Sequence, residues 1–241
     1  MINNGQKILT LLGLGLLLWT LSACEDLLGV RGKGDIVTEN RNVKNFHAVD
    51  IATPGTVELR VDSVYRVEVN CEESIIPYLE TLEDHGVLKI HFDRDVYDVD
   101  HLKIIAYAPS WDGIEVSGSA HADAPDTING DVLNLSISGS GGIRIFKADF
   151  NKIRSRTTGS GNISIYGSAD DLNCSITGSG DVDALDCPVK TATVHISGSG
   201  DARLDVSETL DVTITGSGDV EYRGSPQVSV NSSGSGKVHK I

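Results

Sequence analysis

The sequence predicts an all-β protein: a parallel β-helix or flattened β-roll solenoid with coils of about 20 residues, capped N-terminally by antiparallel β-hairpins. Within residues 114–241, apolar and polar residues alternate with a period of two and no helical pattern interrupts them. Before residue 114, short alternating segments are separated by turn residues. A tetrapeptide [Ser/Thr]-Gly-Ser-[Gly/Ala] also recurs at intervals of 21, 20, 19, 20, 18 and 18 residues, at 117–120, 138–141, 158–161, 177–180, 197–200, 215–218 and 233–236.

The first 23 residues have the pattern of a lipoprotein signal peptide. Lys7 precedes a short apolar run from Ile8 to Thr20, and Leu21-Ser22-Ala23 places small residues before Cys24. The run is shorter than the roughly 20 apolar residues of a membrane-spanning helix. We expect cleavage to leave Cys24 as an acylated N-terminus that anchors the protein to the outer membrane, on its periplasmic or cell-surface face. The alternative is an ordinary secretory signal cleaved near Ala23.

Residues 24–42 are polar and contain glycine, which indicates a tether leading into the fold. Residues 43–113 are expected to form the cap of antiparallel hairpins, with turns at Pro54-Gly55, Asp62-Ser63 and Asp84-His85-Gly86. Pro77 limits the segment from Ser74 to Leu82 to a single helical turn. The expected strands of the cap are Phe46–Ile51, Val57–Val61, Val64–Asn70, Val87–Phe92 and Leu102–Tyr107.

Residues 114–241 are expected to form the Gly-Ser-Gly repeat solenoid, one coil per repeat. Successive side chains of a strand point to opposite faces, so each coil buries one parity of residues. The second and fourth positions of each tetrapeptide, which are glycine except at Ala120, fall on the buried parity. There glycine permits a close approach of the backbone or the φ values of a bend. Six steps of about 4.8 Å give a stack roughly 30 Å tall.

The composition bears on the classes of partner and reaction. A formal net charge of −14, 5% aromatic residues and the lack of a basic arm argue against nucleic acid. The coils vary only from 18 to 21 residues, which leaves no insertion long enough to wall a catalytic cleft. The sequence contains no pattern typical of a catalytic triad or carboxylate pair, and none that calls for a metal or another cofactor. The sequence therefore predicts a protein that is not an enzyme.

Three cysteines follow Cys24, namely Cys71, Cys174 and Cys187. Export would permit a disulfide, and Cys174 with Cys187 is one candidate pair. The other interpretation is that they are small thiols packed in the core. The buried thiols are slightly favoured, because free cysteine packs readily in apolar cores.

Stacking the tetrapeptides in register predicts a double row of hydroxyl groups on the outward parity, which we call the hydroxyl ladder. One interpretation is structural, because such hydroxyls can bond to neighbouring coils at the bend. The other is that the ladder faces a ligand such as a glycan, or ice. The candidate ligand-facing residues are Ser138, Ser140, Thr158, Ser160, Thr177, Ser179, Ser197, Ser199, Thr215 and Ser217.

Two charged groups also repeat or cluster. Asp181, Asp201 and Asp219 follow the tetrapeptide in three consecutive coils, about 5 Å apart, where a cation could relieve their repulsion. The equivalent positions elsewhere are not acidic, so solvated turn residues are the favoured interpretation. Lys152, Arg154 and Arg156 share the outward parity of one coil, beside Lys147. They either pair with nearby carboxylates or contact an anionic glycan.

The sequence resembles the head GIN domain family of putative auto-transporter adhesins, found in lipoproteins of Bacteroidota. The resemblance extends over about residues 43–223. It rests on an opening strand Val43-x-x-Phe46-x-x-Val49-x-Ile51, on Tyr107-Ala108-Pro109-Ser110 leading into the first repeat, and on the periodic Gly-Ser-Gly. The family implies a largely β-helical fold outside the cytoplasm. Glu25-Asp26 after the lipidated cysteine also resembles the acidic export signals of surface lipoproteins in Bacteroidota.

These observations lead to three hypotheses of function. The first is a non-catalytic cell-envelope lipoprotein, an adhesin or surface interaction module that contacts the membrane through Cys24 and binds a glycan or an envelope protein. The second is a structural envelope protein that packs against another protein. The third and weakest is a β-helical enzyme that processes polysaccharides.

Overall fold

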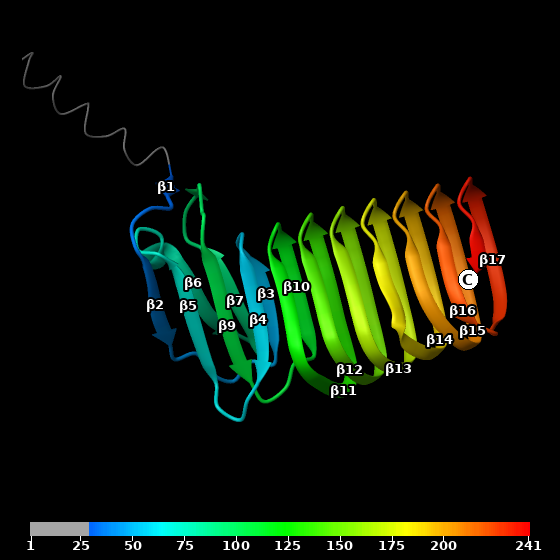
Figure 1. Cartoon of the computed structure of the whole chain (residues 1–241), viewed down its shortest axis with the longest axis horizontal. Coiled ribbons are helices and arrows are strands. Elements are labelled where there is room, and N and C mark those ends of the chain that lie inside the picture. The colour runs from blue at the N-terminus through cyan, green and yellow to red at the C-terminus, as the bar shows by residue number, and fades with distance from the viewer. Residues whose placement is uncertain (1–28) are drawn as a thin grey trace, which may run out of the picture.

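Long bent strands make up most of the computed structural model, which describes residues 29–241. They follow one another along a single axis from the N-terminal to the C-terminal end (Figure 1). A short 3-10 helix at Ile76–Tyr78 agrees with the helical turn expected there. The strands are β1 Val30–Arg31, β2 Ile36–Arg41, β3 Ala48–Ala52, β4 Thr56–Val61, β5 Arg66–Glu72, β6 Leu79–Asp84, β7 Val87–Phe92, β8 Val96–Tyr97, β9 Leu102–Ala108, β10 Gly113–Gly118, β11 His121–Gly139, β12 Gly142–Gly159, β13 Asn162–Gly178, β14 Val182–Gly198, β15 Ala202–Gly216, β16 Val220–Gly224, β17 Gln227–Gly234 and β18 Val238–Lys240.

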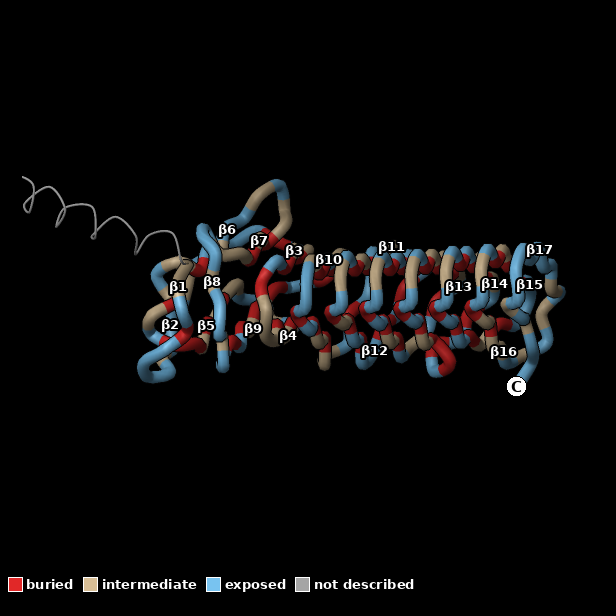
Figure 2. The backbone as a smooth tube through the Cα atoms, turned by 90° about the horizontal axis from the view of Figure 1, so that it is seen from above, coloured by how far each residue is buried: buried red, intermediate tan, exposed pale blue. Residues whose placement is uncertain are grey.

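Strands β11 to β15 each bend midway and contribute to two facing sheets. We call the sheet that contains β6, β7, β3, β10, the C-terminal halves of β11–β15 and β17 sheet 1. Sheet 2 contains β2, β5, β9, β4, the N-terminal halves of β11–β15, β16 and β18. Seen from above, two rows of backbone enclose the buried residues (Figure 2). The predicted all-β solenoid with coils of about 20 residues is confirmed.

The repeated coils stack in parallel and in register, as the tetrapeptides predict. Ser138 pairs with Thr158, which pairs with Thr177, and the same column continues to Ser233. The apolar parity points inward, so that Ile196 and Ile214 are at most 2% exposed. Burying such a side chain is worth about 1.5–3 kcal/mol relative to leaving it in water. The core is therefore a continuous column between the two sheets.

Both reasons for glycine on the inward parity apply in the structure. Gly198 has a φ of +138°, and a Cβ atom placed there would lie 2.1 Å from the carbonyl oxygen of Gly178 in the preceding coil. At Gly200 a Cβ would lie 2.1 Å from the carbonyl oxygen of Gly180 and 2.8 Å from Ile176. The close contacts let the bend of each coil rest directly on the bend before it.

The N-terminal cap is not the predicted series of antiparallel hairpins. Strand β3 pairs in parallel with β7 and β10, and β4 pairs in parallel with β9 and β11. Antiparallel pairing is found for β2–β5, β5–β9 and β6–β7. Parallel pairing prevails because Val49 and Ile51 continue the buried columns of Ile114 and Val116. The cap therefore extends the solenoid core before closing it.

The three predicted turns of the cap have different roles. Asp84-His85-Gly86 connects a true hairpin, β6–β7, with positive φ angles of 52° at His85 and 84° at Gly86. Pro54-Gly55 joins β3 to β4, which belong to different sheets. Asp62-Ser63 joins β4 to β5, which lie on either side of β9 and do not pair with each other. Turn residues alone do not reveal which strands they bring together.

The predicted tether, residues 24–42, is partly folded. Within it, β1 pairs with β8, and β2 pairs with β5 from Ile36 opposite Glu72 to Arg41 opposite Val67. The guanidinium of Arg41 donates hydrogen bonds to the carbonyl oxygens of Ile76 and Leu79. These backbone and side-chain bonds hold a mostly polar strand whose sequence carries no buried face. Residues 1–28, which include the predicted signal peptide and Cys24, lie outside the described residues.

Two buried hydroxyls interrupt the apolar column of sheet 1, and Thr157 is the more deeply buried. Its side chain is 0% exposed, stacks between Ile137 and Ile176, and its Oγ1 has no hydrogen-bond partner among the described residues. We expect Thr157→Val to raise the free energy of unfolding by about 1–2 kcal/mol, because it removes an uncompensated hydroxyl at nearly constant volume. Urea denaturation measures the change.

The neighbouring Thr158 supplies the control, since it lies on the same strand with its side chain in solvent. Thr158→Val should change the free energy of unfolding by no more than about 0.5 kcal/mol. A loss of stability in Thr157→Val would mean that the Thr157 hydroxyl has a bonding role in the core.

Candidate functional site

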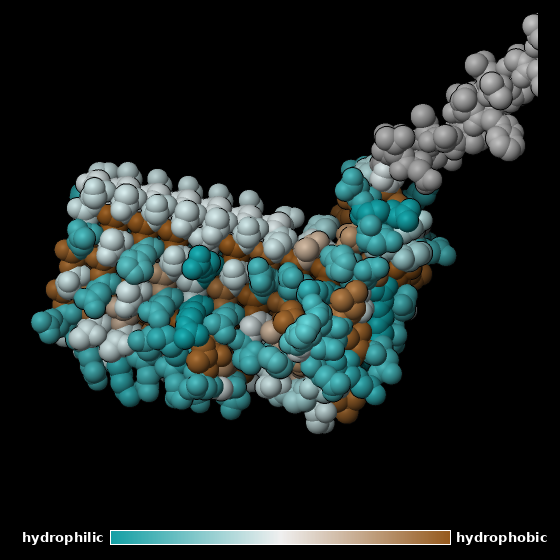
Figure 3. All heavy atoms as spheres, turned by 180° about the vertical axis from the view of Figure 1, so that it is seen from behind, coloured by the Kyte–Doolittle hydropathy of each residue, from teal (hydrophilic) through white to brown (hydrophobic). Residues whose placement is uncertain are grey.

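The hydroxyl ladder lies where the C-terminal ends of β11–β15 meet the following bends. All ten candidate residues from Ser138 to Ser217 are exposed. Seen from behind, a pale band of intermediate hydropathy runs along the edge of the stack where these strands end (Figure 3). At the last step, the hydroxyl of Ser235 donates to that of Ser217 at 3.0 Å. The two rows therefore form a regular polar edge that is open to solvent.

Backbone hydrogen bonds fix the spacing of this edge. The amide of Ser199 donates to the carbonyl oxygen of Gly178 at 2.8 Å, and that of Ser217 donates to Gly198 at 2.8 Å. The same bond recurs at each repeat from Ser140 to Ser235. The side chains are thus held one strand spacing apart, about 4.8 Å. A ligand that lies along the hydroxyl ladder would therefore contact one pair of hydroxyl groups per coil.

The aspartate column has a structural role. The carboxylate Oδ1 of Asp181 accepts a hydrogen bond from the backbone amide of Asp201 at 2.9 Å, and Asp201 accepts one from the amide of Asp219 at 2.7 Å. Asp219 does the same for Lys237, and Asn162 for Asp181. Each side chain therefore accepts a hydrogen bond from a backbone amide at the start of the next coil. This hydrogen bond is stronger when the acceptor is a charged carboxylate. Among residues 29–241 no group of three or more potential metal ligands is found.

This column yields a matched pair of variants. Asp201→Ala leaves the amide of Asp219 without its acceptor and should lower the free energy of unfolding by about 2 kcal/mol. Asp201→Asn keeps an acceptor oxygen, like that of Asn162 at the start of the same column, and should cost less than about 1 kcal/mol. Urea denaturation of both proteins measures the difference. Equal losses in the two variants would contradict the role assigned to the acceptor.

The basic stripe divides into paired and unpaired members. The Lys152 ammonium lies 3.0 Å from a carboxylate oxygen of Asp171 on the adjacent strand, so pairing holds for this residue. Arg154 donates a long hydrogen bond of 3.4 Å to the side-chain oxygen of Asn134. Arg156 has no hydrogen-bond or ion-pair partner among the described residues. Lys147 lies on the bend, opposite Thr127, and not beside the two arginines on sheet 1.

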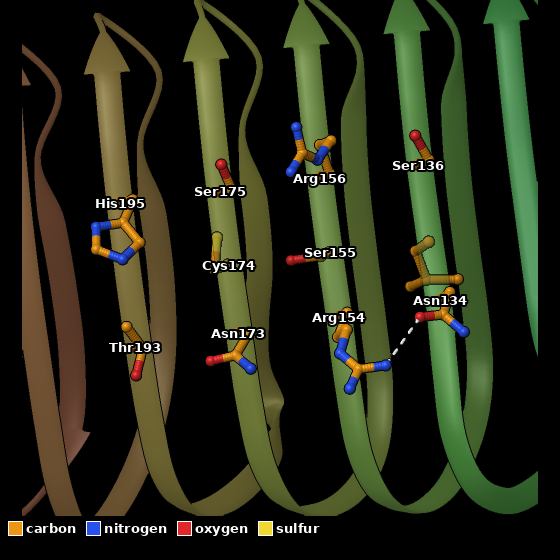
Figure 4. Close-up of a pocket in the computed structure, with 11 residues that line it drawn as sticks. Asn134, Ser136, Arg154, Ser155, Arg156, Asn173, Cys174, Ser175, Thr193 and His195 are labelled. Carbon is orange, nitrogen blue, oxygen red and sulfur yellow. Dashed lines mark hydrogen bonds between the residues drawn. The ribbon is translucent and has the colours of Figure 1, made fainter.

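The two arginines line a shallow depression of about 420 Å³ on the outer face of sheet 1. Its side chains come from four consecutive strands, with Arg154 and Arg156 on one strand between neutral polar neighbours (Figure 4). Sequence reasoning found the arginines but missed the depression. The period of the repeat aligns these neighbours, but it does not show that their side chains leave a hollow between them. The lining side chains on the outward parity are Asn134, Ser136, Arg154, Arg156, Asn173, Ser175, Thr193 and His195.

The three described cysteines are free and buried, which agrees with the interpretation as core thiols rather than a Cys174–Cys187 disulfide. Burial raises the pKa of both Cys174 and Cys187 to about 12 and that of Cys71 to about 11. Thiols with pKa values this high carry almost no thiolate at neutral pH and make poor nucleophiles. In the part of the chain that the structure describes, no helix has the length and apolar character needed to cross a membrane.

Comparison with solved structures places this fold among known proteins. A crystal structure described as a putative adhesin from Bacteroides fragilis superimposes with a TM-score of 0.83 at 21% identity, covering 88% of this chain and 100% of that one. A putative lipid binding protein from Parabacteroides distasonis gives 0.76 at 22% identity, covering 88% and 98%. A putative adhesin from Parabacteroides merdae gives 0.70 at 21% identity, with the same coverages. At these identities the similarity shows a shared fold.

The family is shown by the sequence. None of the curated proteins matches the chain. The sequence profile of one family does match, over residues 45–226, from the start of the cap to the penultimate coil. This range agrees with the extent of the resemblance inferred from the opening strand and the Gly-Ser-Gly period. The chain therefore belongs to the family described as putative auto-transporter adhesin, head GIN domain.

Proposed function

We propose that this chain is a non-catalytic cell-envelope lipoprotein that acts as an adhesin or surface interaction module. The observation that supports this most strongly is the outer surface of the solenoid, where the hydroxyl ladder repeats exposed polar groups in register over consecutive coils. The shallow, open depression on this surface suits the side of an extended ligand better than a small molecule enclosed for reaction. Membership of an adhesin-like family agrees with this role.

The proposed attachment depends on Cys24. Cleavage before this residue and its acylation would anchor the solenoid to the outer membrane, on the periplasmic or the cell-surface side. Labelling cells with a fatty acid analogue should tag the protein, and Cys24→Ser should abolish the tag. Protease treatment of whole cells tests the orientation, since a surface-exposed protein is degraded and a periplasmic one survives.

Ligand binding is tested with the chain from residue 25 onward, which holds every strand that the structure describes. On a glycan array, specific binding supports the adhesin. A ladder variant in which Thr158, Thr177 and Ser197 are all replaced by alanine should lose any glycan that lies on the hydroxyl ladder. Because these side chains are exposed, the variant should keep the circular dichroism of the unmodified chain.

The second candidate is a structural envelope protein that packs against another protein. One observation favours it: Val230 lies on the inward parity of the last strand of sheet 1, opposite Val212, yet it is 49% exposed. The C-terminal end of the core is thus open, and a partner protein could cover it. The absence of binding on the glycan array, together with cross-linking to an envelope protein in cells, would support this candidate over the first. Release of sugar products from a bound polysaccharide would instead support an enzyme.

A further inference from the structure

Arg154 and Arg156 differ from the other arginines of the protein. All ten arginines lie within the described residues, and the other eight each have a carboxylate partner. Arg154 and Arg156 have none among residues 29–241, although the chain carries 34 acidic residues. The two uncompensated guanidinium groups are next to each other on the same strand and the same face. On a chain with a net charge of −14, this local concentration of positive charge is exceptional.

The register explains why no carboxylate reaches them. On the two adjacent strands, Arg154 is paired with Asn134 on one side and with Asn173 on the other. Arg156 is paired in the same way with Ser136 and Ser175. Asp171, on the adjacent strand, is engaged by Lys152 at 3.0 Å. The guanidinium groups are therefore surrounded by amides and hydroxyls, which are neutral groups that hydrogen-bond to ligands without neutralising the charge.

The placement of the two arginines favours an extended anionic ligand. Their backbone positions lie about 7 Å apart on one strand, and their guanidinium groups point away from each other along it (Figure 4), so each can bind a different anionic group of the same ligand. Guanidinium groups bind oxyanions such as carboxylate or sulfate through paired N–H donors in a planar fork. The surrounding side chains extend this contact over two more strands, to Thr193 and His195 (Figure 4). The depression therefore combines charge recognition with donors and acceptors for hydroxyl groups.

We propose that this depression, the arginine surface, binds an acidic polysaccharide through its carboxylate or sulfate groups, with Arg154 and Arg156 as the anion-binding residues. The inference rests on the proposed adhesin function and specifies its ligand class. We favour a glycan over an acidic peptide because the outward side chains that line the depression are amides, hydroxyls, guanidinium groups and an imidazole, which can hydrogen-bond to the hydroxyl groups of sugars. Its open, shallow form on a flat sheet suits a chain of sugars lying across the strands.

The test measures binding of the chain from residue 25 onward to immobilised polygalacturonate, dextran sulfate, neutral dextran and poly-glutamate at 0.15 M salt. We expect binding to at least one of the two acidic polysaccharides, with the better of them identifying carboxylate or sulfate as the recognised group. Neutral dextran should bind at least about tenfold more weakly. The double variant Arg154→Gln/Arg156→Gln should lose about tenfold or more of the affinity for the acidic polysaccharide.

A matched control removes the same charge from sheet 2. Arg144 and Arg203 are about half exposed and are paired with Asp123 and with Asp183 and Glu221. Arg144→Gln/Arg203→Gln should bind the acidic polysaccharide within about twofold of the unmodified chain. The conservative variant Arg154→Lys/Arg156→Lys keeps the charge but loses the planar fork of N–H donors. Its affinity for the acidic polysaccharide should lie between those of the Arg154→Gln/Arg156→Gln variant and the sheet 2 control. Circular dichroism checks that each variant is folded.

Several results would overturn the inference. They are equal affinity of the Arg154→Gln/Arg156→Gln variant and the unmodified chain, an equal loss in the sheet 2 control, or tighter binding of poly-glutamate than of both acidic polysaccharides. Binding of neutral glycans alone on the array would overturn the arginine surface and leave the proposed adhesin function standing. If no glycan bound, neither the acidic polysaccharides nor any glycan on the array, both the arginine surface and the proposed adhesin function would be overturned.

Discussion

Gly198→Ala is expected to lower the free energy of unfolding by more than about 4 kcal/mol, a loss that few single substitutions cause. Two penalties combine at this position. The φ of +138° is a conformation that residues with a Cβ rarely adopt. The added Cβ would also lie 2.1 Å from the carbonyl oxygen of Gly178, which accepts hydrogen bonds from Ser199 and Gly200. The two coils would have to separate and break these bonds, and urea denaturation followed by far-ultraviolet circular dichroism measures the loss.

Gly118 provides a control at the equivalent position of the first repeat. Its φ is also positive, at +101°, but no atom lies within 4 Å of the position of an added Cβ. The reason is that β3 pairs with β10 only as far as Val116, so no backbone lies beneath Gly118. Gly118→Ala should cost about 1–2 kcal/mol from backbone strain alone. If both variants lost the same amount, the contact between successive bends would not limit the sequence.

Alkaline pH is expected to destabilise the protein through its buried thiols. In the unfolded chain Cys174 and Cys187 ionise near pH 9, whereas burial raises their pKa in the folded protein to about 12. Between these values the unfolded state releases protons that the folded state retains, so the free energy of unfolding falls as the pH rises above 9. The loss is about 1.4 kcal/mol per thiol and pH unit, or about 4 kcal/mol for both at pH 10.5.

The double variant Cys174→Ala/Cys187→Ala isolates this contribution. It is less stable than the unmodified chain at pH 8, because two buried side chains are shortened. Between pH 8 and pH 10.5, however, its free energy of unfolding should fall by about 4 kcal/mol less, while Cys71 and all other groups titrate as before. Urea denaturation at both pH values gives the comparison. The same pH dependence in both proteins would show that the two thiols ionise equally well in the folded state.

The repeat region was predictable because one short motif sets three properties at once. The tetrapeptide fixes where a coil bends, which parity faces inward and which residue stacks on which. Its period alone aligned Ser138 with Thr158 and Thr177, as the strand pairing confirms. The cap, residues 43–113, contains no repeated motif that aligns its strands. Its alternating segments indicate strands, but Val49 and Ile51 look the same whether their neighbours run parallel or antiparallel.

Other features depended on contacts that a sequence pattern cannot supply. Strand β2 is held by backbone bonds to β5, and its polar sequence, Ile36 to Arg41, shows no alternation of buried residues. For the aspartate column, the sequence favours solvated turn residues and does not reveal the hydrogen bonds that the carboxylates accept from backbone amides of the next coil. For Arg154 and Arg156, the sequence left open whether they pair with carboxylates or carry free charge. The answer required the side-chain contacts, in which Lys152 engages Asp171 and neither arginine has a carboxylate partner among residues 29–241.

The direction of the hydrogen bonds between coils determines how the protein responds to a mechanical load. Because these bonds run along the stack, a force that pulls its two ends apart opens them one coil after another rather than all together. The C-terminal coil should yield first, because β18 is only three residues long and Val230 on β17 is 49% exposed. Each rupture frees 18 to 21 residues, an extension of about 60–70 Å. Pulled from its ends, the protein should lengthen in steps and absorb work at each one.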